Sequence, residues 1–402
     1  MKFRVPPSLG HTMAEAIAIC RDPRLLAWSL FIIFFPFYVV PNGLPQPAVW
    51  LLVVLMPSIF ASWDGKLMTD TRRTLMALAR FVLYAVIANL LWTVWVGKIS
   101  VDLKDSFILS PLFYIFNLLL FFTILLLHRR YGLKFLWLTT RVILVSLGLQ
   151  ILVSLGGSSR MRSTNAFNEP NQLGYYGLLC ACILLLGQRR TKMSTVAVLA
   201  GVTMASYLAL LSASKAALAS IAMLAIAILI GRLRTMIVAA LVFVVLLVTP
   251  NPFSAALERA QERIDRDESH DFFEERGYDR IVNNPEYWVL GSGEGAYRRF
   301  KDTTVIGSHE LHSSLGTMFF CYGIVGTVLF GIFMWFVMKR TPLQTWMVVG
   351  PAFAYGMTHQ GLRFALMWVL LGVVVSLREE DKLAAAARKP VVRPVIAPKA
   401  AA

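Results

Sequence analysis

Charged residues are scarce in this chain of 402 residues, in which Asp, Glu, Lys and Arg together make up 15%. Hydrophobic residues make up 57%, whereas soluble domains carry roughly 45–50% apolar and about 25% charged residues. This composition excludes a soluble globular enzyme and also a disordered chain. Only four cysteines are present, and their spacing fits neither a disulfide framework nor a zinc site. We expect Cys20, Cys180, Cys182 and Cys321 to be buried, inert thiols.

Long apolar runs take up most of the sequence. A membrane-spanning helix needs about 20 mostly apolar residues. Twelve runs approach this length: 25–40, 45–62, 74–96, 107–127, 134–155, 172–187, 193–211, 215–231, 235–250, 312–338, 344–358 and 360–377. We therefore predict an all-α integral membrane protein with about twelve transmembrane helices. The first run shows no small-residue cleavage pattern, so we interpret it as a span rather than a signal peptide.

These runs divide the chain into five parts: an N-terminal cytoplasmic segment (1–24), helices one to nine (25–250), a large periplasmic loop (251–311), helices ten to twelve (312–377) and a cytoplasmic tail (378–402). Within the loop, an apolar stripe among dense charges predicts a surface helix from Ser254 to about Arg280. Pro285 and three glycines then predict a turn-rich stretch, and the Ala- and Pro-rich tail is expected to be disordered.

The net charge of +16 is an orientation signal. With both termini inside, the inner segments hold 23 Lys/Arg and 7 Asp/Glu, and the outer segments hold 14 and 16. Every short inner loop is basic, as the positive-inside rule requires. The excess of positive charge therefore lies on the cytoplasmic side of a membrane, and it no longer indicates nucleic acid as a partner.

Several polar side chains fall at the outer edge of the predicted membrane, where desolvation is costly and a functional role is favoured. They are Arg160, Arg162, Lys215, Arg276, Arg280, His309, His312 and Arg363. Lys215 joins two apolar runs, so it either extends to the surface or faces a wet cavity. Arg160 and Arg162, one residue apart, suit a bidentate phosphate contact or an ordinary solvated loop.

His309 and His312 share a helical face if the tenth helix begins early, but no third ligand lies near them, and we predict no metal site. A single histidine at this place suits a helix start or a general base. Arg276 and Arg280, four residues apart on the predicted surface helix, are equally compatible with a salt-bridged, solvated face.

One pattern resembles a known family. His312-Ser313, nine further residues and then Gly323-Ile-Val-Gly326-Thr327 match His-[Asn/Ser/Gln]-x9-Gly-x-x-Gly-[Thr/Val]. This pattern is similar to the signature of the O-antigen ligases of Gram-negative bacteria, within the O-antigen ligase/polymerase superfamily. We interpret the two glycines as structural, since small residues one turn apart allow another helix or a lipid chain to approach closely.

Two weaker matches lie in the outer loops. Arg162-Ser-Thr-Asn-Ala-Phe167-Asn-Glu-Pro170-Asn171 resembles the superfamily's Arg…Phe…Pro-Asn segment, and Arg276 followed by a Pro/Gly turn resembles its loop pattern. One position departs from the family, which often has arginine in Ser-Arg-x-x-x-Leu at the outer start of a span. Here Lys215 keeps the charge without the bidentate geometry of arginine.

The resemblance implies a GT-C-like glycosyltransferase of the bacterial inner membrane with a periplasmic active site. Its substrates would be O-antigen linked to undecaprenyl pyrophosphate and the lipid A–core acceptor, in contact with membrane lipids. His312 and Arg276 would be catalytic, and Lys215, Arg160 and Arg162 would bind the pyrophosphate. The reaction would invert the anomeric centre and would need neither a metal nor another cofactor.

Two other functions remain open at this point. An O-antigen polymerase acts on the same lipid carrier, although the histidine–glycine pattern and the single large outer loop favour the ligase. A transporter of lipid-linked sugar would explain twelve spans and outer cations. It predicts more charges midway through the spans than this sequence has, and paired interruptions of helices that the sequence does not show.

Overall fold

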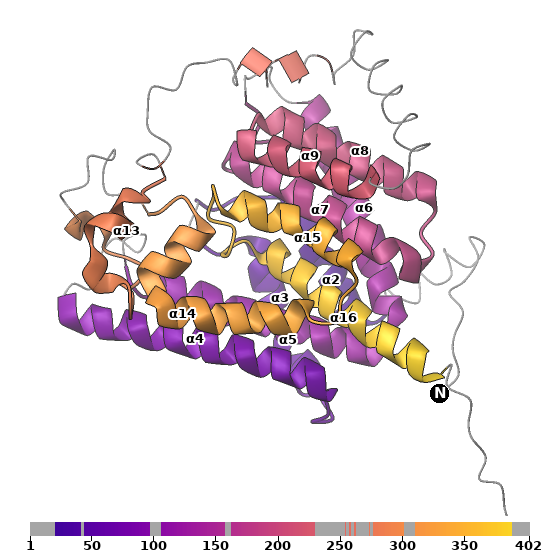
Figure 1. The fold of residues 1–402 in the computed structure, drawn as a ribbon. Coiled ribbons are helices and arrows are strands. Elements are labelled where there is room, and N and C mark those ends of the chain that lie inside the picture. Colours follow the sequence, from indigo (N-terminus) through magenta and orange to yellow (C-terminus); the bar gives the residue numbers. More distant parts are fainter. Residues whose placement is uncertain are drawn as a thin grey trace, which may run out of the picture.

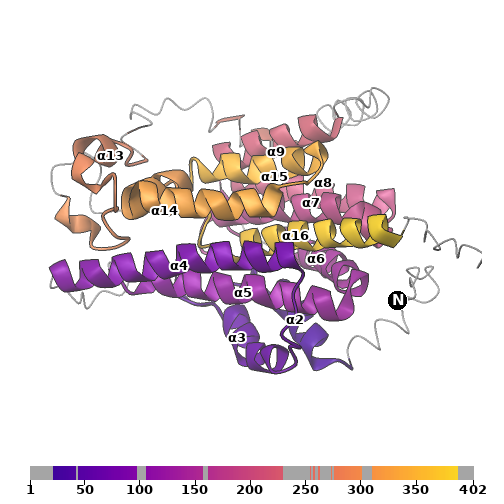
Figure 2. The same cartoon turned by 60° about the horizontal axis from the view of Figure 1, so that its bottom comes forward.

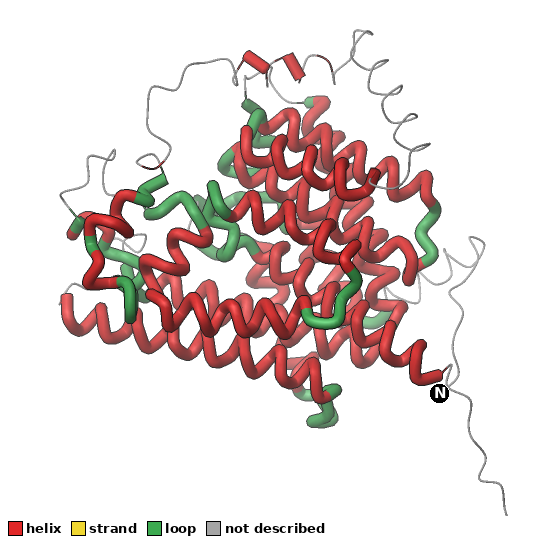
Figure 3. Tube along the Cα trace, in the orientation of Figure 1, coloured by secondary structure: helices red, strands yellow, loops and turns green. Residues whose placement is uncertain are grey.

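The structure, a computed structural model, describes the chain in blocks. The described residues are 21–41, 44–96, 106–156, 162–229, 276–300 and 310–387, together with positions 254, 257, 258, 261, 262 and 273. Within these residues every regular element is an α-helix or a short 3-10 helix (Figure 3). The described part of the chain is therefore all-helical, as its composition predicts.

Eleven of the twelve apolar runs coincide with α-helices, and the ninth run, 235–250, lies outside the described residues. The first eight runs correspond to α2 (Pro23–Phe34), α3 (Pro47–Phe60), α4 (Thr69–Val96), α5 (Leu109–Tyr131), α6 (Leu133–Leu155), α7 (Pro170–Thr191), α8 (Thr195–Ser212) and α9 (Lys215–Leu229). The last three correspond to α14 (Ser314–Met338), α15 (Leu343–Gly356) and α16 (Ala365–Ala387).

Six helices of the described residues are long and apolar enough to cross a membrane: α4, α5, α6, α7, α8 and α14. Helices α2, α3, α9 and α15 are shorter, with 12 to 15 residues, and α16 carries charges towards its C-terminal end. These lengths and compositions are those of an α-helical membrane protein.

The helices form one bundle, shown in two views in Figures 1 and 2. Helices α4, α5, α14 and α16 run alongside one another, with α4 in contact with both α5 and α14. Helix α7 contacts α6, α8, α15 and α16, and 72% of the residues in its most apolar stretch are buried inside the protein. Helices α7 and α16 therefore form the centre of the bundle.

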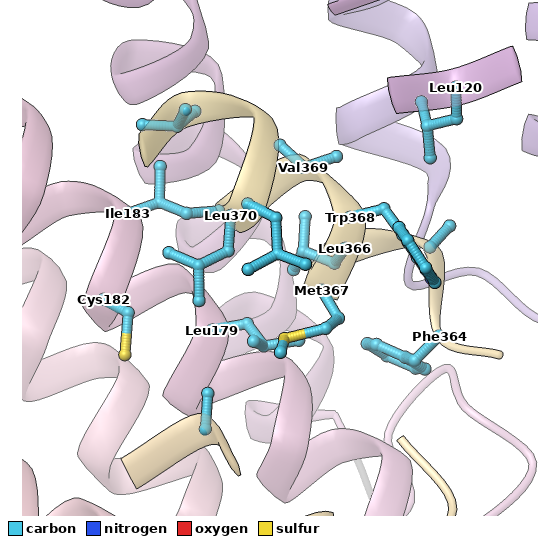
Figure 4. Close-up of a cluster of buried hydrophobic side chains, with 14 of the residues drawn as sticks. Leu120, Leu179, Cys182, Ile183, Phe364, Leu366, Met367, Trp368, Val369 and Leu370 are labelled. Carbon is cyan, nitrogen blue, oxygen red and sulfur yellow. The ribbon is translucent and has the colours of Figure 1, made fainter. Parts of the chain in front are cut away.

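The packing around α16 shows what holds this centre together. Figure 4 shows Leu366 and Leu370 of α16 close to Leu179 and Ile183 of α7, and all four side chains are no more than 1% exposed. Because lipid tails are as apolar as leucine, close packing rather than exclusion of water stabilises such contacts. Gly372 fits this account, since a Cβ there would lie 2.7 Å from Cγ2 of Ile124 in α5.

The end of the bundle at which α5, α7 and α14 finish is called the basic end below. Arginines fill the last turns of α5 and α7, where positive charge is favourable beside the free carbonyls of a helix C-terminus. Asp70, in the first turn of α4, pairs with Lys339 at 3.3 Å and also with Lys382 of α16. These ion pairs join α4, α14 and α16 at one level.

The expectation of disorder from residue 378 onwards is wrong for residues 378–387, which continue α16. Arg378 is 4% exposed and its Nη1 donates to the backbone carbonyl of Val337 at 3.0 Å, which satisfies one of the last carbonyls of α14. Glu379 is also buried and accepts a hydrogen bond from Thr71 of α4. These contacts hold the polar part of α16 in the bundle.

The apolar run 312–338 predicted one continuous tenth helix, but the helix found there, α14, is broken. Gly323 adopts φ +64° and ψ −169° and breaks α14 into two parts. Only glycine adopts this backbone conformation readily. Gly326, one turn further on, meets Tyr84 of α4, so a neighbouring helix does approach there, as the sequence predicted.

Candidate functional site

A cavity of about 910 Å³ lies at the end of the bundle opposite the basic end. Its walls come from the first turns of α3, α5, α7 and α9, the last turn of α15, and the segments that lead into α14 and α16. The polar lining consists of Gln46, Arg162, Glu169, Asn171, Gln172, Ser214, Lys215, Arg276, Glu310, His312, His359, Gln360 and Arg363. We call this region the polar cavity.

Arg162 and Lys215 reach the polar cavity together, although 53 residues separate them in the sequence. Arg162 donates from Nε to the carbonyl oxygen of Ser212 at 3.2 Å and from Nη2 to Oδ1 of Asn171 at 2.8 Å. These bonds fix the guanidinium beside the turn between α8 and α9. Lys215 is the first residue of α9 and is exposed, so its charge adds to the positive end of the helix dipole.

Arg276 and His312 are joined through their backbones. The amide of His312 donates to the carbonyl oxygen of Arg276 at 3.2 Å, and Nη1 of Arg276 donates to the carbonyl oxygen of Thr358 at 3.0 Å. The next residue, Ser313, caps α14: its hydroxyl accepts from the amide of Gly316 at 3.0 Å. The side chain of His312 is exposed and lines the cavity.

The structure corrects the expected arrangement of Arg276 and Arg280. Residues 276–278 form a turn in which Gly277 has φ +73°, and the short helix α13 (Asp279–Asn283) begins only after it, so the two arginines do not share a continuous helical face. Arg280 is 2% exposed, with its guanidinium 6.0 Å from the centre of the Tyr297 ring. Burial lowers the pKa of Arg280, against the attraction of Asp279.

Four of the five site residues named from the sequence therefore line one cavity: Arg162, Lys215, Arg276 and His312. Arg160 lies outside the described residues, as do His309 and most of the predicted surface helix between residues 254 and 275. Within the described part of the chain, no three His, Cys, Asp or Glu side chains are grouped so that they could hold a metal ion. Cys180, Cys182 and Cys321 are free and buried, as predicted, and Cys20 is not described.

An ion-pair network that extends from the cavity lining into the protein interior was not predicted from the sequence. Glu294 is fully buried and accepts from Nε of Arg363 at 2.9 Å and from the hydroxyl of Tyr322 at 2.6 Å. Nη1 of Arg363 lies 2.8 Å from Glu310, which faces the cavity. The carboxylates of Glu294 and Glu310 thus compensate the positive charge of Arg363.

This network connects parts of the chain that are distant in sequence. The backbone amide of Glu294 donates to Oδ1 of Asn89 in α4 at 2.7 Å, and Nη2 of Arg363 donates to Ser110 in α5 at 3.1 Å. Glu294 belongs to a stretch whose glycines predicted only turns, Gly293-Glu294-Gly295. The lone carboxylate between two glycines was the available signal, but its arginine partner lies 69 residues further along the chain.

Part of the cavity wall is apolar. It is made by side chains from the end of α2, the first turns of α3 and the first half of α5: Phe35, Leu44, Val49, Trp50, Val53, Leu109, Leu112, Phe113, Ile115, Phe116 and Leu119. Trp50 is 56% exposed and Leu112 is 54% exposed, so the wall extends to the protein surface. The cavity thus offers a positively charged region next to an apolar surface between α3 and α5.

No protein-family model and no curated protein match this chain. The function is therefore argued from the geometry of the polar cavity and from the sequence pattern whose histidine, His312, lines it.

Proposed function

We propose that the protein is an O-antigen ligase. It transfers a polysaccharide in one block from undecaprenyl pyrophosphate to a sugar hydroxyl of lipid A–core, at the periplasmic face of the bacterial inner membrane. In this proposal the chain has twelve spans and a GT-C-like architecture. The basic end and both termini are cytoplasmic, in agreement with the positive-inside rule, and the polar cavity opens to the periplasm.

One observation carries the proposal: a single cavity is lined by four cationic side chains, an exposed histidine and an apolar wall. Of the four cations, Arg363 is paired with Glu294 and Glu310. A lipid-linked glycosyl pyrophosphate has the matching parts, namely an anionic centre, a reactive sugar and a long hydrocarbon chain. The histidine is also the one that opens the His-Ser-x9-Gly-x-x-Gly pattern.

The cations suit the pyrophosphate. Negative charge on the leaving group grows in the transition state, and fixed positive groups in a site of low dielectric stabilise it. Arg162, Lys215 and Arg276 line the cavity from three different segments, and the N-terminal end of α9 adds backbone amides and a positive dipole. Arg160, close to Arg162 in sequence, is included as a further phosphate ligand.

His312 suits the role of general base. It takes the proton of the acceptor hydroxyl while that oxygen attacks the anomeric carbon, and the carbon–oxygen bond to the pyrophosphate breaks with its electron pair leaving on the phosphate. In-line attack inverts the anomeric centre. The backbone bond from His312 to Arg276 keeps the base next to one of the leaving-group cations.

Arg363 has a different part in this proposal. Its positive charge is matched by Glu294 and Glu310, so it positions the two carboxylates rather than binding phosphate. The apolar wall between α3 and α5 receives the first isoprene units of the carrier, because hydrocarbon and apolar side chains associate without loss of hydrogen bonds.

The test is transfer in vitro from lipid-linked polysaccharide to lipid A–core, comparing the wild type with His312→Ala. Loss of a general base typically reduces the rate about 10²–10⁴-fold. Near wild-type transfer by His312→Ala would refute the assignment of the base. The product also discriminates between functions: a polymerase extends the lipid-linked chain without capping the core, and a transporter moves the donor without any acceptor.

The same assay tests metal dependence. We expect full transfer in excess EDTA, since the proposed stabilisation of the leaving group uses protein cations. A loss of activity that Mg²⁺ or Mn²⁺ restores would contradict metal independence without affecting the assignment of His312.

A further inference from the structure

The segment Trp288–Gly291 lies in the break of α14. The amide of Ile324 donates to the carbonyl oxygen of Trp288 at 2.7 Å, and the amide of Val325 donates to that of Val289 at 3.3 Å. In the other direction, the amides of Ser292 and Gly293 donate to the carbonyl oxygens of Phe320 and Cys321, each at 2.9 Å. The segment thus replaces the helical hydrogen bonds that α14 loses at Gly323.

Helix α4 satisfies the remaining carbonyls of this segment. The hydroxyl of Tyr84 donates to the carbonyl oxygen of Leu290 at 2.8 Å, and Nε1 of Trp92 donates to that of Gly291 at 3.1 Å. All four carbonyls from Trp288 to Gly291 therefore have protein donors. Inside a bilayer, irregular backbone is tolerated only where protein groups or trapped water satisfy its polar atoms.

The position of this contact along the helices sets its depth. Gly323 lies 16 residues from Lys339, which is about 24 Å at 1.5 Å per residue, and Tyr84 lies 14 residues from Asp70, or about 21 Å. Lys339 and Asp70 form the ion pair of the basic end. A hydrocarbon core is about 30 Å thick. With the ion pair at one boundary of that core, the contact between α14 and the segment Trp288–Gly291 lies roughly 6–9 Å inside the opposite boundary. A tilt of the helices places the contact deeper still.

Three side chains of the segment, those of Trp288, Val289 and Leu290, are apolar and reach the protein surface. Nε1 of Trp288 donates to the carbonyl oxygen of Ile281 at 2.6 Å, so its one polar atom has a protein partner. Trp288 is 42% exposed, Val289 60% and Leu290 64%. The adjacent helices also expose apolar side chains here, Leu83 of α4 at 59% and Ile324 of α14 at 49%. None of the residues from Trp288 to Gly291 is charged. This surface is therefore continuous with the lipid-facing sides of two helices that are long enough to span a membrane.

We propose that Trp288, Val289 and Leu290 form a wedge that inserts among the acyl chains of the leaflet at the cavity end. The partner is the hydrocarbon layer of the bilayer itself. The wedge and Arg276 belong to one continuous stretch of chain, residues 276–300. An inserted wedge therefore fixes the depth of Arg276 relative to the membrane, and with it the depth of His312, whose amide is bonded to the Arg276 carbonyl. The proposal does not depend on the transferase function, because it follows from backbone bonding, depth and exposure alone.

The test uses nitroxide spin labels on single cysteines of the full chain in phospholipid nanodiscs. The background carries Cys20→Ser, since Cys180, Cys182 and Cys321 are buried. Leu290→Cys is the test position, Leu83→Cys is a lipid-facing control at the same depth, and Glu286→Cys is an exposed polar control four residues away. Power saturation measures collisions with oxygen, which concentrates in lipid, and with a water-soluble nickel chelate.

We expect the label at Leu290→Cys to match the label at Leu83→Cys, with frequent oxygen collisions and few nickel collisions, while Glu286→Cys shows the reverse. A label at Leu290→Cys that collides with nickel as often as Glu286→Cys does would overturn the proposal. A label shielded from both reagents would overturn it as well, because a second copy or another protein would then cover the wedge. Val289→Cys repeats the measurement if Leu290→Cys does not yield folded protein.

Discussion

Replacing Gly323 with alanine tests the structural account most directly, because this glycine is where α14 and the wedge meet. A Cβ built at Gly323 would lie 2.5 Å from the carbonyl carbon of Val289 and 2.7 Å from the amide nitrogen of Gly291, and closer still to the carbonyl oxygen of Val289. All of these are backbone atoms, which cannot rotate away as the tip of a flexible side chain can. The backbone of Gly323 also has φ +64° and ψ −169°, a region that alanine avoids.

Two costs add for Gly323→Ala. A residue held in such a sparsely populated backbone region costs about 1–3 kcal/mol. Overpacking a filled site typically costs about 1–3 kcal/mol more. The expected loss of stability is therefore roughly 2–6 kcal/mol, unless the wedge leaves the break of α14 and its four hydrogen bonds are lost instead. Either outcome destabilises the protein.

Gly331→Ala is the matched control, in the same helix and with nothing within 4 Å of the added Cβ. In a regular helix this change is favourable by about 0.5–1 kcal/mol. Thermal unfolding of the detergent-solubilised proteins should give the Tm order Gly331→Ala at or above wild type, and Gly323→Ala well below both. Equal Tm values for the two variants would refute the positive-φ break and the close contact with the wedge.

Three further predictions concern the cavity and the ion-pair network of Arg363, Glu294 and Glu310. Arg363→Leu should lower the free energy of unfolding by about 3–5 kcal/mol, because it leaves the buried carboxylate of Glu294 without its arginine partner. In unfolding experiments the double variant Arg363→Leu/Glu294→Leu should recover much of this loss. No recovery in the double variant would contradict the pairing. Arg276→Ala should nearly abolish transfer and Arg276→Lys should retain part of it, since lysine keeps the charge but cannot make the bidentate phosphate contact that a guanidinium can make. Wild-type transfer by Arg276→Ala would remove this residue from the proposed site. In the same assay, Lys215→Arg should retain transfer and Lys215→Ala should lose it. An inactive Lys215→Arg variant would show that the shape of the lysine side chain matters and not only its charge.

Much of the fold was predictable because hydrophobic length is a local property. Apolar runs of about 20 residues specify helices whatever their neighbours are, and eleven of the twelve runs coincide with described helices. The errors arose where long-range contacts override local composition. The Ala- and Pro-rich composition from residue 378 onwards suggested a disordered tail, but Arg378 and Glu379 have partners on α14 and α4 and extend the helix. The break at Gly323 likewise depends on a segment more than 30 residues earlier.

The polar cavity was predictable in part for a similar reason. The cations named from the sequence lie in outer loops or at the outer ends of predicted spans, and these come together at one level of a bundle. The sequence did not reveal how the individual cations are placed in the folded chain. Arg363 stood among the outer cations, yet Glu294 and Glu310 neutralise it, and Arg280 packs against Tyr297 outside the cavity. Only the three-dimensional arrangement separates these two arginines from Arg162, Lys215 and Arg276.

The spacing of the histidine–glycine pattern acquires a physical meaning from this arrangement. Ser313 caps α14 directly after His312, and Gly323 breaks the helix after nine intervening residues, so the first part of α14 is a rigid spacer of about 13 Å. The same loop segment holds both ends of the spacer, through the carbonyl of Arg276 at His312 and through the amide of Gly293 at Cys321. Adding or removing one residue would turn His312 by about 100° around the helix axis relative to the break. In this chain the spacing therefore sets the orientation of one exposed histidine relative to Arg276 and to the wedge.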